Sequence, residues 1–151
     1  MRAIKQFVDE NNRVYASISI DSELSLLMCI WFGEISQAGQ VAKVHQYCSE
    51  QVQAQSIKNW LSDVTSLEGE FLSFSGEAQK SAFEALSHTE LQHFAIVSHR
   101  SANPVRSAMI NTLKQLGIEG RTFENIPTAL DWLTSNKSLS HNWGIGLSAN
   151  G

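Results

Sequence analysis

The sequence predicts an α/β domain built on a mixed β-sheet of about five strands, with helices packed mostly on one face. Two observations lead to this prediction. Over residues 91–133 an apolar run, a helical segment, a short β-like run and a second helical segment follow one another with almost no linker. Strands that alternate with helices in this way form parallel βαβ units. Closer to the N-terminus, two β-like runs are separated by only three polar residues, which favours an antiparallel hairpin.

Length and composition are those of one ordinary globular domain. A chain of 151 residues, of which 42% are hydrophobic and 17% charged, can bury a sizeable core. The formal net charge is −4, and the 11 Lys and Arg residues are scattered along the chain. Because nucleic-acid binding and anchoring on acidic lipids both need a concentrated basic surface, we expect neither of these partners.

Nothing in the sequence predicts export or a membrane span. Residues 1–12 (MRAIKQFVDENN) lack the apolar region of a signal peptide, and the longest apolar run, residues 26–32, is too short to cross a bilayer. Cys29 and Cys48 each lie among apolar positions and do not have a metal-binding or redox spacing, so we expect buried, reduced thiols. These features predict a cytoplasmic protein without a transmembrane segment.

The first two predicted strands form a hairpin. Residues 14–20 (VYASISI) alternate apolar and small polar side chains, as a half-buried strand does. Residues 21–23 (DSE) form a polar turn. Residues 24–32 (LSLLMCIWF) are almost continuously apolar, which predicts a central strand that is buried on both faces.

A helix and a third strand follow. Ser36 is a suitable N-cap, and the helix it begins runs to about Gln53 with an apolar stripe formed by Val41, Val44, Cys48 and Val52. Residues 57–64 (IKNWLSDV) form the third strand. Because the chain enters this strand from a helix, we expect it to be parallel to a neighbour.

The middle of the chain has the weakest pattern, over residues 65–76. Helical spacing of apolar residues resumes near Phe71 or Ser75 and continues to Ser87. Residues 91–98 then form the fourth strand.

The last third of the chain carries clear helix-end signals. Asn103 is suited to cap a helix, Pro104 to its first turn and Gly117 to its end. Residues 121–124 form a short last strand, after which Asn125 caps a final helix. Residues 135–151 are rich in Ser, Asn and Gly, so we expect a domain over residues 1–134 and a flexible or loosely packed tail over residues 135–151.

The order of these elements, together with four short motifs, resembles the SpoIIAA-like family of the STAS superfamily, which comprises bacterial STAS or CRAL-TRIO-like domains. The motifs are DSELSLL leading into IWFG (21–33), WLSD (60–63), FAIVS (94–98) and RTFENIPTALDWL (121–133). The resemblance covers roughly residues 14–133. It implies a STAS-like fold and a regulatory role.

The chain departs from the best understood STAS proteins in one segment. Anti-sigma-factor antagonists carry a DSSG tetrapeptide around a phosphorylated serine after the third strand, whereas this chain has DVTSLEGEFLSFSGE over residues 63–77. The nearest hydroxyl groups belong to Thr65, Ser66, Ser73 and Ser75. The resemblance therefore supports the fold, and the tetrapeptide of the phosphorylation switch is missing from this segment.

The candidate binding site lies at the carboxyl ends of the third and fourth strands, where open α/β sheets place their ligands. Its members are polar side chains of two loops and of the helix that follows: Asp63, Thr65, Ser66, Ser98, His99, Arg100, Ser101, Asn103 and Arg106. The helix N-terminus and its two arginines favour an anion. The alternative is a solvated loop with an ordinary N-cap, and an Asx or Ser/Thr turn around Asp63.

Catalytic and cofactor motifs are missing. The sequence has no GxSxG, no GxxxxGK[ST] and no GxGxxG after a strand, and its five histidines lack the spacing of metal ligands. We therefore expect no enzyme activity, no metal and no cofactor.

The leading functional prediction is a non-enzymatic interaction or regulatory module whose partner is another protein or, in a homodimer, a second copy of the chain. The alternative is a carrier or sensor that holds a small apolar or lipid-like ligand in an internal pocket, because Trp31, Trp60 and Trp132 lie in or beside core elements. A buried cavity lined by Met28, Trp60 and Phe83 would favour the carrier.

Overall fold

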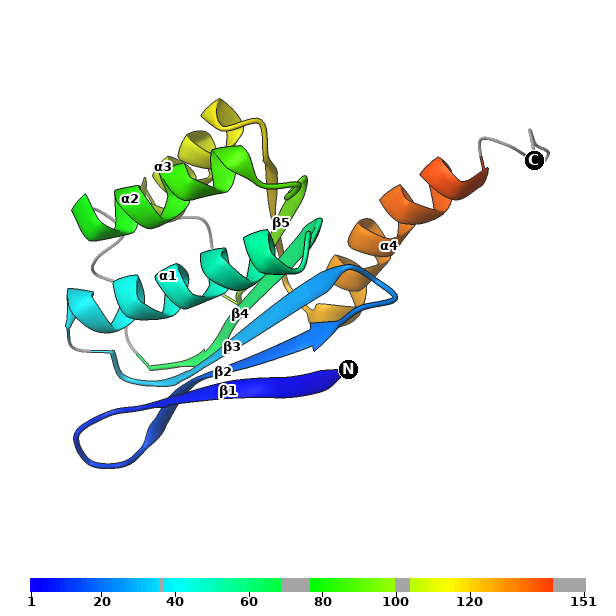
Figure 1. Ribbon diagram of the computed structural model, residues 1–151. Helices are drawn as coiled ribbons and strands as arrows, with labels where there is room; N and C mark the ends of the chain where they lie inside the picture. Colours follow the sequence, from blue (N-terminus) through cyan, green and yellow to red (C-terminus); the bar gives the residue numbers. More distant parts are fainter. Residues whose placement is uncertain (36, 69–76, 100–103, 143–151) are drawn as a thin grey trace.

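A mixed sheet with helices on both faces forms the structure in the computed structural model, which describes residues 1–35, 37–68, 77–99 and 104–142 (Figure 1). The strands in these residues are β1 (Arg2–Val8), β2 (Val14–Asp21), β3 (Leu26–Gly33), β4 (Asn59–Leu67), β5 (His93–Val97) and β6 (Glu119–Phe123). The helices are α1 (Ala38–Ala54), α2 (Glu77–Glu84), the 3₁₀ turn η1 (Ala85–His88), α3 (Pro104–Gln115) and α4 (Ile126–Asn142).

The strands lie in the sheet in the same order as in the chain, from β1 to β6. The β1–β2 and β2–β3 pairs are antiparallel, and the pairs from β3 to β6 are parallel. This confirms both the predicted hairpin and the parallel third strand. The β2–β3 turn spans residues 22–25, where the Leu24 N–H donates to Asp21 Oδ1 at 3.2 Å and Ser25 has a φ of 50°.

Strand β1 corrects the predicted strand count from about five to six. It is an edge strand that pairs with β2 alone, from Arg2 opposite Ile20 to Val8 opposite Val14. Phe7 is its one buried residue. Because an edge strand buries so little, its sequence lacks a clear apolar alternation, and a register shift between Ala3 and Lys5 interrupts the period further.

The sheet separates two apolar clusters, one on each face. The larger cluster lies under α1, α2, η1 and α3 and includes Cys29, Trp31, Trp60, Phe83 and Phe94. The smaller one lies under α4, whose Ala129 and Leu133 pack with Leu26, Met28, Leu61, Ala95 and Val97. Figure 1 shows α1, α2 and α3 on one side of the sheet and α4 on the other. The prediction of helices mostly on one face is therefore confirmed.

The ends of three helices lie at or next to the positions that local sequence signals predicted. Gly117 ends α3 with a φ of 84°, and its N–H donates to the Lys114 carbonyl at 3.0 Å. Asn125 caps α4, because its Oδ1 accepts the Thr128 N–H at 2.9 Å. Helix α1 is capped by Gln37, one position after the predicted Ser36, which lies outside the described residues.

The predicted start of the second helix lies outside the described residues, and the predicted end of the last helix differs from the observed one. Helix α2 and η1 end at His88, next to the predicted Ser87, but the predicted starts at Phe71 and Ser75 lie outside those residues. Helix α4 reaches Asn142, well past residue 134. No helix in the described part of the chain is long and apolar enough to span a membrane.

Candidate functional site

The predicted site residues that the structure describes lie at the carboxyl edge of the parallel strands. Asp63 on β4 stands opposite Val97, the last residue of β5, so that Ser98 and His99 follow at the same edge. The Ser98 N–H donates to the carbonyl of Phe123, the last residue of β6, at 2.9 Å. The structure therefore brings the ends of β5 and β6 beside Asp63 of β4, which itself continues to Leu67.

Asp63 has a structural role within β4. Its Oδ1 accepts hydrogen bonds from the Thr65 N–H at 2.9 Å and from Thr65 Oγ1 at 2.7 Å. The register of β4 against β3 shifts here, because Ile30 pairs with Asp63 but Phe32 pairs with Ser66. One additional β4 residue is thus accommodated in a β-bulge. The alternative interpretation of Asp63 as an Asx turn describes this geometry, although the strand continues to Leu67 instead of ending.

The site residues differ in how accessible they are. Asp63 and Ser98 are buried, with 6% and 4% of their surface exposed. Thr65 is half-buried, whereas Ser66 and His99 are exposed. The edge therefore combines a fixed buried framework with exposed polar side chains that a partner could contact.

The other predicted members belong to the segment that leads into α3. Arg100, Ser101 and Asn103 lie outside the described residues, and Arg106 falls in the first turns of α3, after Pro104. Their contribution to the site stays a prediction.

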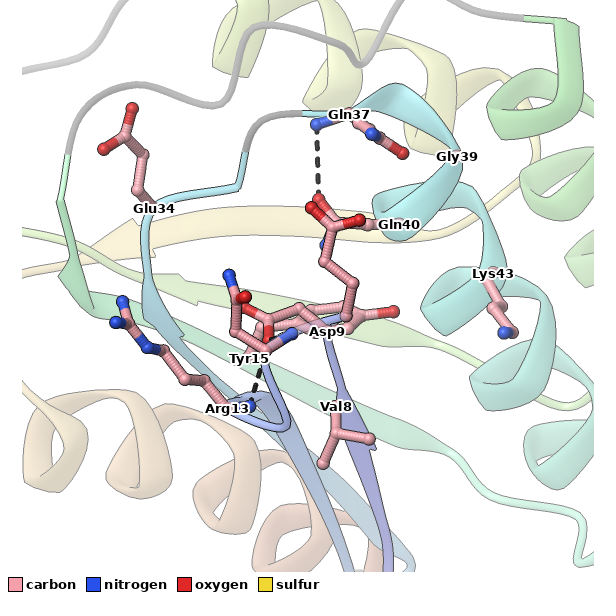
Figure 2. A pocket seen from close by; sticks show the side chains of 11 residues that line it. Val8, Asp9, Arg13, Tyr15, Glu34, Gln37, Gly39, Gln40 and Lys43 are labelled. Atoms are coloured by element: carbon pink, nitrogen blue, oxygen red, sulfur yellow. Dashed lines mark hydrogen bonds between the residues drawn. The ribbon is translucent and has the colours of Figure 1, made fainter.

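A cleft of about 570 Å³, which was not predicted from the sequence, lies at the same edge of the sheet, beside the first hairpin (Figure 2). We call it the hairpin–helix cleft. It lies between the β1–β2 turn, the end of β3 and the start of α1, and its lining residues are Val8, Asp9, Glu10, Asn11, Arg13, Tyr15, Glu34, Gln37, Gly39, Gln40 and Lys43. The polar run DENNR over residues 9–13 was the available signal, but it marks a hairpin turn only if β1 is recognised.

Tyr15 is the one buried residue among those that line the hairpin–helix cleft. The residue is 5% exposed, and burial, followed by the negative charge of Asp9, raises the pKa of its phenol. Asp9 holds the turn itself, because its Oδ1 accepts the N–H groups of Asn11 at 2.8 Å and Arg13 at 3.0 Å. Asn12 adopts a φ of 62° in the same turn.

The residues expected to line an apolar carrier cavity do not come together. Met28 belongs to the cluster under α4, whereas Trp60 and Phe83 belong to the cluster on the opposite face of the sheet. Trp60 is fully buried, and its ring centroid lies 4.8 Å from that of Phe94. The sheet therefore separates Met28 from the other two side chains, and the described structure gives the carrier alternative no support.

The two thiols are core residues, as predicted. Cys29 on β3 and Cys48 on α1 are free and fully buried. Burial, together with a hydrogen bond to Cys48, raises the pKa of Cys29 well above its usual value. A thiol in this environment stays protonated and unreactive. Within the described ranges, no three His, Cys, Asp or Glu side chains are grouped as metal ligands would be.

Comparison with known proteins places the fold. No protein-family model and no curated protein matches the sequence. Among solved structures, the chain is similar to an anti-sigma factor antagonist from Mycobacterium paratuberculosis, with a TM-score of 0.52 and 15% identity over 85% of this chain and 99% of the other. It is also similar to an uncharacterised protein with a SpoIIAA-like fold from Shewanella loihica, with a TM-score of 0.45 and 18% identity over 87% and 92% of the two chains.

The likeness to the anti-sigma factor antagonist confirms the predicted fold class. The chain is an α/β domain with a SpoIIAA-like, STAS-type fold. At 15% identity the likeness concerns the fold, so the function has to be argued from the carboxyl edge of the sheet.

Proposed function

We propose that the protein is a non-enzymatic regulatory module that binds another protein through the carboxyl edge of β4 and β5. The observation that carries this proposal is the pairing of Asp63 with Val97, which brings the polar segments after both positions to one edge. The same fold occurs in a protein named an anti-sigma factor antagonist, a name that describes action on another protein.

The geometry of this edge suits recognition of a protein surface. Asp63 is satisfied by Thr65, and the Ser98 backbone is held by Phe123, so the framework is fixed before any partner arrives. A preorganised surface loses less conformational entropy on binding. Ser66 and His99 are exposed beside this framework and are therefore the described side chains best placed to contact a partner.

An apolar contact is available at the same edge. Phe32 on β3 is 36% exposed and pairs in register with Ser66 on β4. Protein interfaces combine aromatic anchors with a polar rim, and Phe32 beside Ser66 offers both within adjacent strands.

Affinity purification from the native host tests the proposal. The tagged chain is compared with a Ser66→Glu/His99→Glu variant, which adds two negative charges at the proposed surface without touching a buried side chain. We expect one or a few discrete proteins to be captured by the parent chain and at least about tenfold less by the variant, because unpaired charges buried at an interface and lost contacts cost several kcal/mol.

A matched control uses the opposite edge of the sheet. Glu23→Lys/Lys58→Glu exchanges two exposed charges in the β2–β3 turn and just before β4. This variant should capture the same proteins as the parent. Equal loss in both variants, or capture that the Ser66→Glu/His99→Glu variant leaves unchanged, would contradict the proposed surface. Identical melting temperatures of all three chains establish that folding is intact.

A further inference from the structure

The hairpin–helix cleft contains a tyrosine hydroxyl that no group in the described structure satisfies. Tyr15 is 95% buried and lines the cleft, yet its hydroxyl has no hydrogen-bond partner among the described residues. The hydroxyl itself is not sealed from solvent, because the only fully buried side-chain polar atom without a partner in the described residues is Trp60 Nε1. The hydroxyl is therefore available to a ligand in the cleft.

Charged side chains also line the cleft, and among them Asp9 already accepts two backbone hydrogen bonds through its Oδ1. Asp9, Glu10 and Glu34 supply carboxylates, and Arg13 and Lys43 supply cations. None of these five forms an ion pair with another, since the ion pair of the described residues joins Arg121 and Glu119 on β6. Both signs of charge thus face one cleft without neutralising each other within it.

The cleft has the size of a small-molecule site but not the lining of a lipid site. Its volume of about 570 Å³ lies within the usual range for ligand pockets. Among the described lining residues Val8 is the only large aliphatic one, and the others are charged, amide, hydroxyl or glycine residues. This volume accommodates several peptide units, and the polar lining matches their amides.

The walls of the cleft are held in place without a ligand. The Asp9 N–H donates to the Arg13 carbonyl at 2.9 Å, and the Asn12 N–H donates to the Asp9 carbonyl at 3.0 Å. On the helical side, the Gln37 N–H donates to Gln40 Oε1 at 3.2 Å, a bond drawn in Figure 2. A site that is already formed pays little ordering cost on binding.

From these observations we propose that the hairpin–helix cleft binds a short peptide-like zwitterion, whose cationic group contacts the carboxylates and whose carboxylate contacts Arg13 and Lys43. The Tyr15 hydroxyl donates a hydrogen bond to the ligand. Two kinds of molecule present this pair of charges: a free short peptide with charged termini, or an internal segment of a protein with one basic and one acidic side chain. This inference is independent of the surface proposed at β4 and β5, because the two share no residue.

Titration of the full ¹⁵N-labelled chain with three probes tests the proposal. The probes are tetraglycine with free termini, acetyl-Lys-Gly-Gly-Glu-amide, and the uncharged acetyl-Gln-Gly-Gly-Gln-amide. We expect saturable shifts of the amide signals of residues 8–15 and 37–43 with at least one charged probe, and no shifts with the uncharged one. Binding of tetraglycine identifies free peptides as the source, and binding of the blocked charged peptide identifies a protein segment.

Variants connect the binding to the named side chains. Tyr15→Phe should weaken binding about fivefold, the usual effect of one net hydrogen bond. Glu34→Gln/Lys43→Gln removes one exposed charge of each sign from the cleft and should weaken it at least about tenfold. Glu23→Gln/Lys58→Gln removes the same charges at the opposite edge and should leave binding unchanged.

Three outcomes would overturn the proposal. They are equal binding of the charged and uncharged peptides, equal weakening by the cleft and control variants, and the absence of saturable shifts with both charged probes. None of these results bears on capture of a partner through Ser66 and His99, so the two proposals fail separately.

Discussion

Asp63 and Thr65 form a closed pair within β4, in which one carboxylate oxygen accepts both the backbone N–H and the side-chain hydroxyl of Thr65, at 2.9 and 2.7 Å. The pair lies at the β-bulge that lets β4 continue to Leu67 beside β3. Residues of this type commonly end a strand. Here the bulge accommodates the turn without ending the strand. The strand continues along the edge that we propose as the interaction surface.

Asp63→Ala should destabilise the fold by about 2–3 kcal/mol, because a partly buried N–H and a hydroxyl lose a charged acceptor. Asp63→Asn keeps an acceptor oxygen and should lower the free energy of unfolding by roughly half as much. Thr65→Val removes the hydroxyl alone and should cost about 1 kcal/mol. Urea denaturation measures all three. A loss for Asp63→Ala no larger than that for Thr65→Val would mean that the carboxylate does not hold the bulge.

The same substitution at two glycines should have opposite effects. Gly117 has a φ of 84° and open space where a Cβ would lie, so Gly117→Ala should cost about 1 kcal/mol through backbone strain alone. Gly39 lies in the first turn of α1 with equally open space and no positive φ, so Gly39→Ala should stabilise the chain by up to about 1 kcal/mol. Thermal unfolding of both variants measures the contrast, and equal signs would contradict it.

Asn125→Ala should destabilise the protein by about 1 kcal/mol, because its Oδ1 caps the start of α4 through the N–H and hydroxyl of Thr128. Asn111→Ala is the matched control, since Asn111 is exposed within α3 and helix propensity favours alanine there. The free energy of unfolding from denaturant titration should fall for the first variant alone. A fall of the same size in both would assign the effect to the loss of an asparagine and not to the cap.

His93 should make the stability depend on pH. Its Nδ1 lies 3.3 Å from Asn59 Oδ1 and its ring stands edge-on to Trp132 at 5.2 Å. Burial lowers the pKa of His93, partly offset by the charge of Glu119. Between the lowered pKa and about 6.5, the unfolded chain binds a proton that the folded chain does not.

The contribution of His93 to stability is therefore complete above about pH 6.5 and is lost as the pH falls through the lowered pKa. Urea midpoints at pH 7.5 and pH 5 should differ more for the parent chain than for His93→Gln, which cannot titrate. His88→Gln is the control. An equal pH dependence in the parent and His93→Gln would show that other groups cause it.

Local signals in the sequence were sufficient to predict most of the fold. Gly117 and Asn125 mark helix ends through their own backbone and side-chain chemistry, and the apolar run over residues 24–32 marks a central strand. These features depend on neighbours in the sequence. Strand β1 does not, because it buries Phe7 alone and gains its identity by pairing with β2.

Some parts of the candidate site could likewise be predicted from the sequence and others could not. Asp63 and Ser98 could be placed because the apolar runs of β4 and β5 are visible in the sequence and parallel strands share an edge. The hairpin–helix cleft could not be predicted, because it is formed by β1, the turn after β1 and the contact of that turn with α1. This contact joins residues that are far apart in the sequence. The separation of Met28 from Trp60 depends likewise on which face of the sheet each position occupies.

The agreement between strand order and chain order has a kinetic consequence. Since β1 to β6 are neighbours both in the sheet and in the chain, each new strand adds to an edge that already exists, and no later strand has to insert between two earlier ones. The two antiparallel hairpins close short loops, whereas each parallel pair must wait for a crossover helix. During synthesis the chain can therefore assemble its sheet from the N-terminus onwards, with the β1–β3 meander as the template and β6 as the last strand to join.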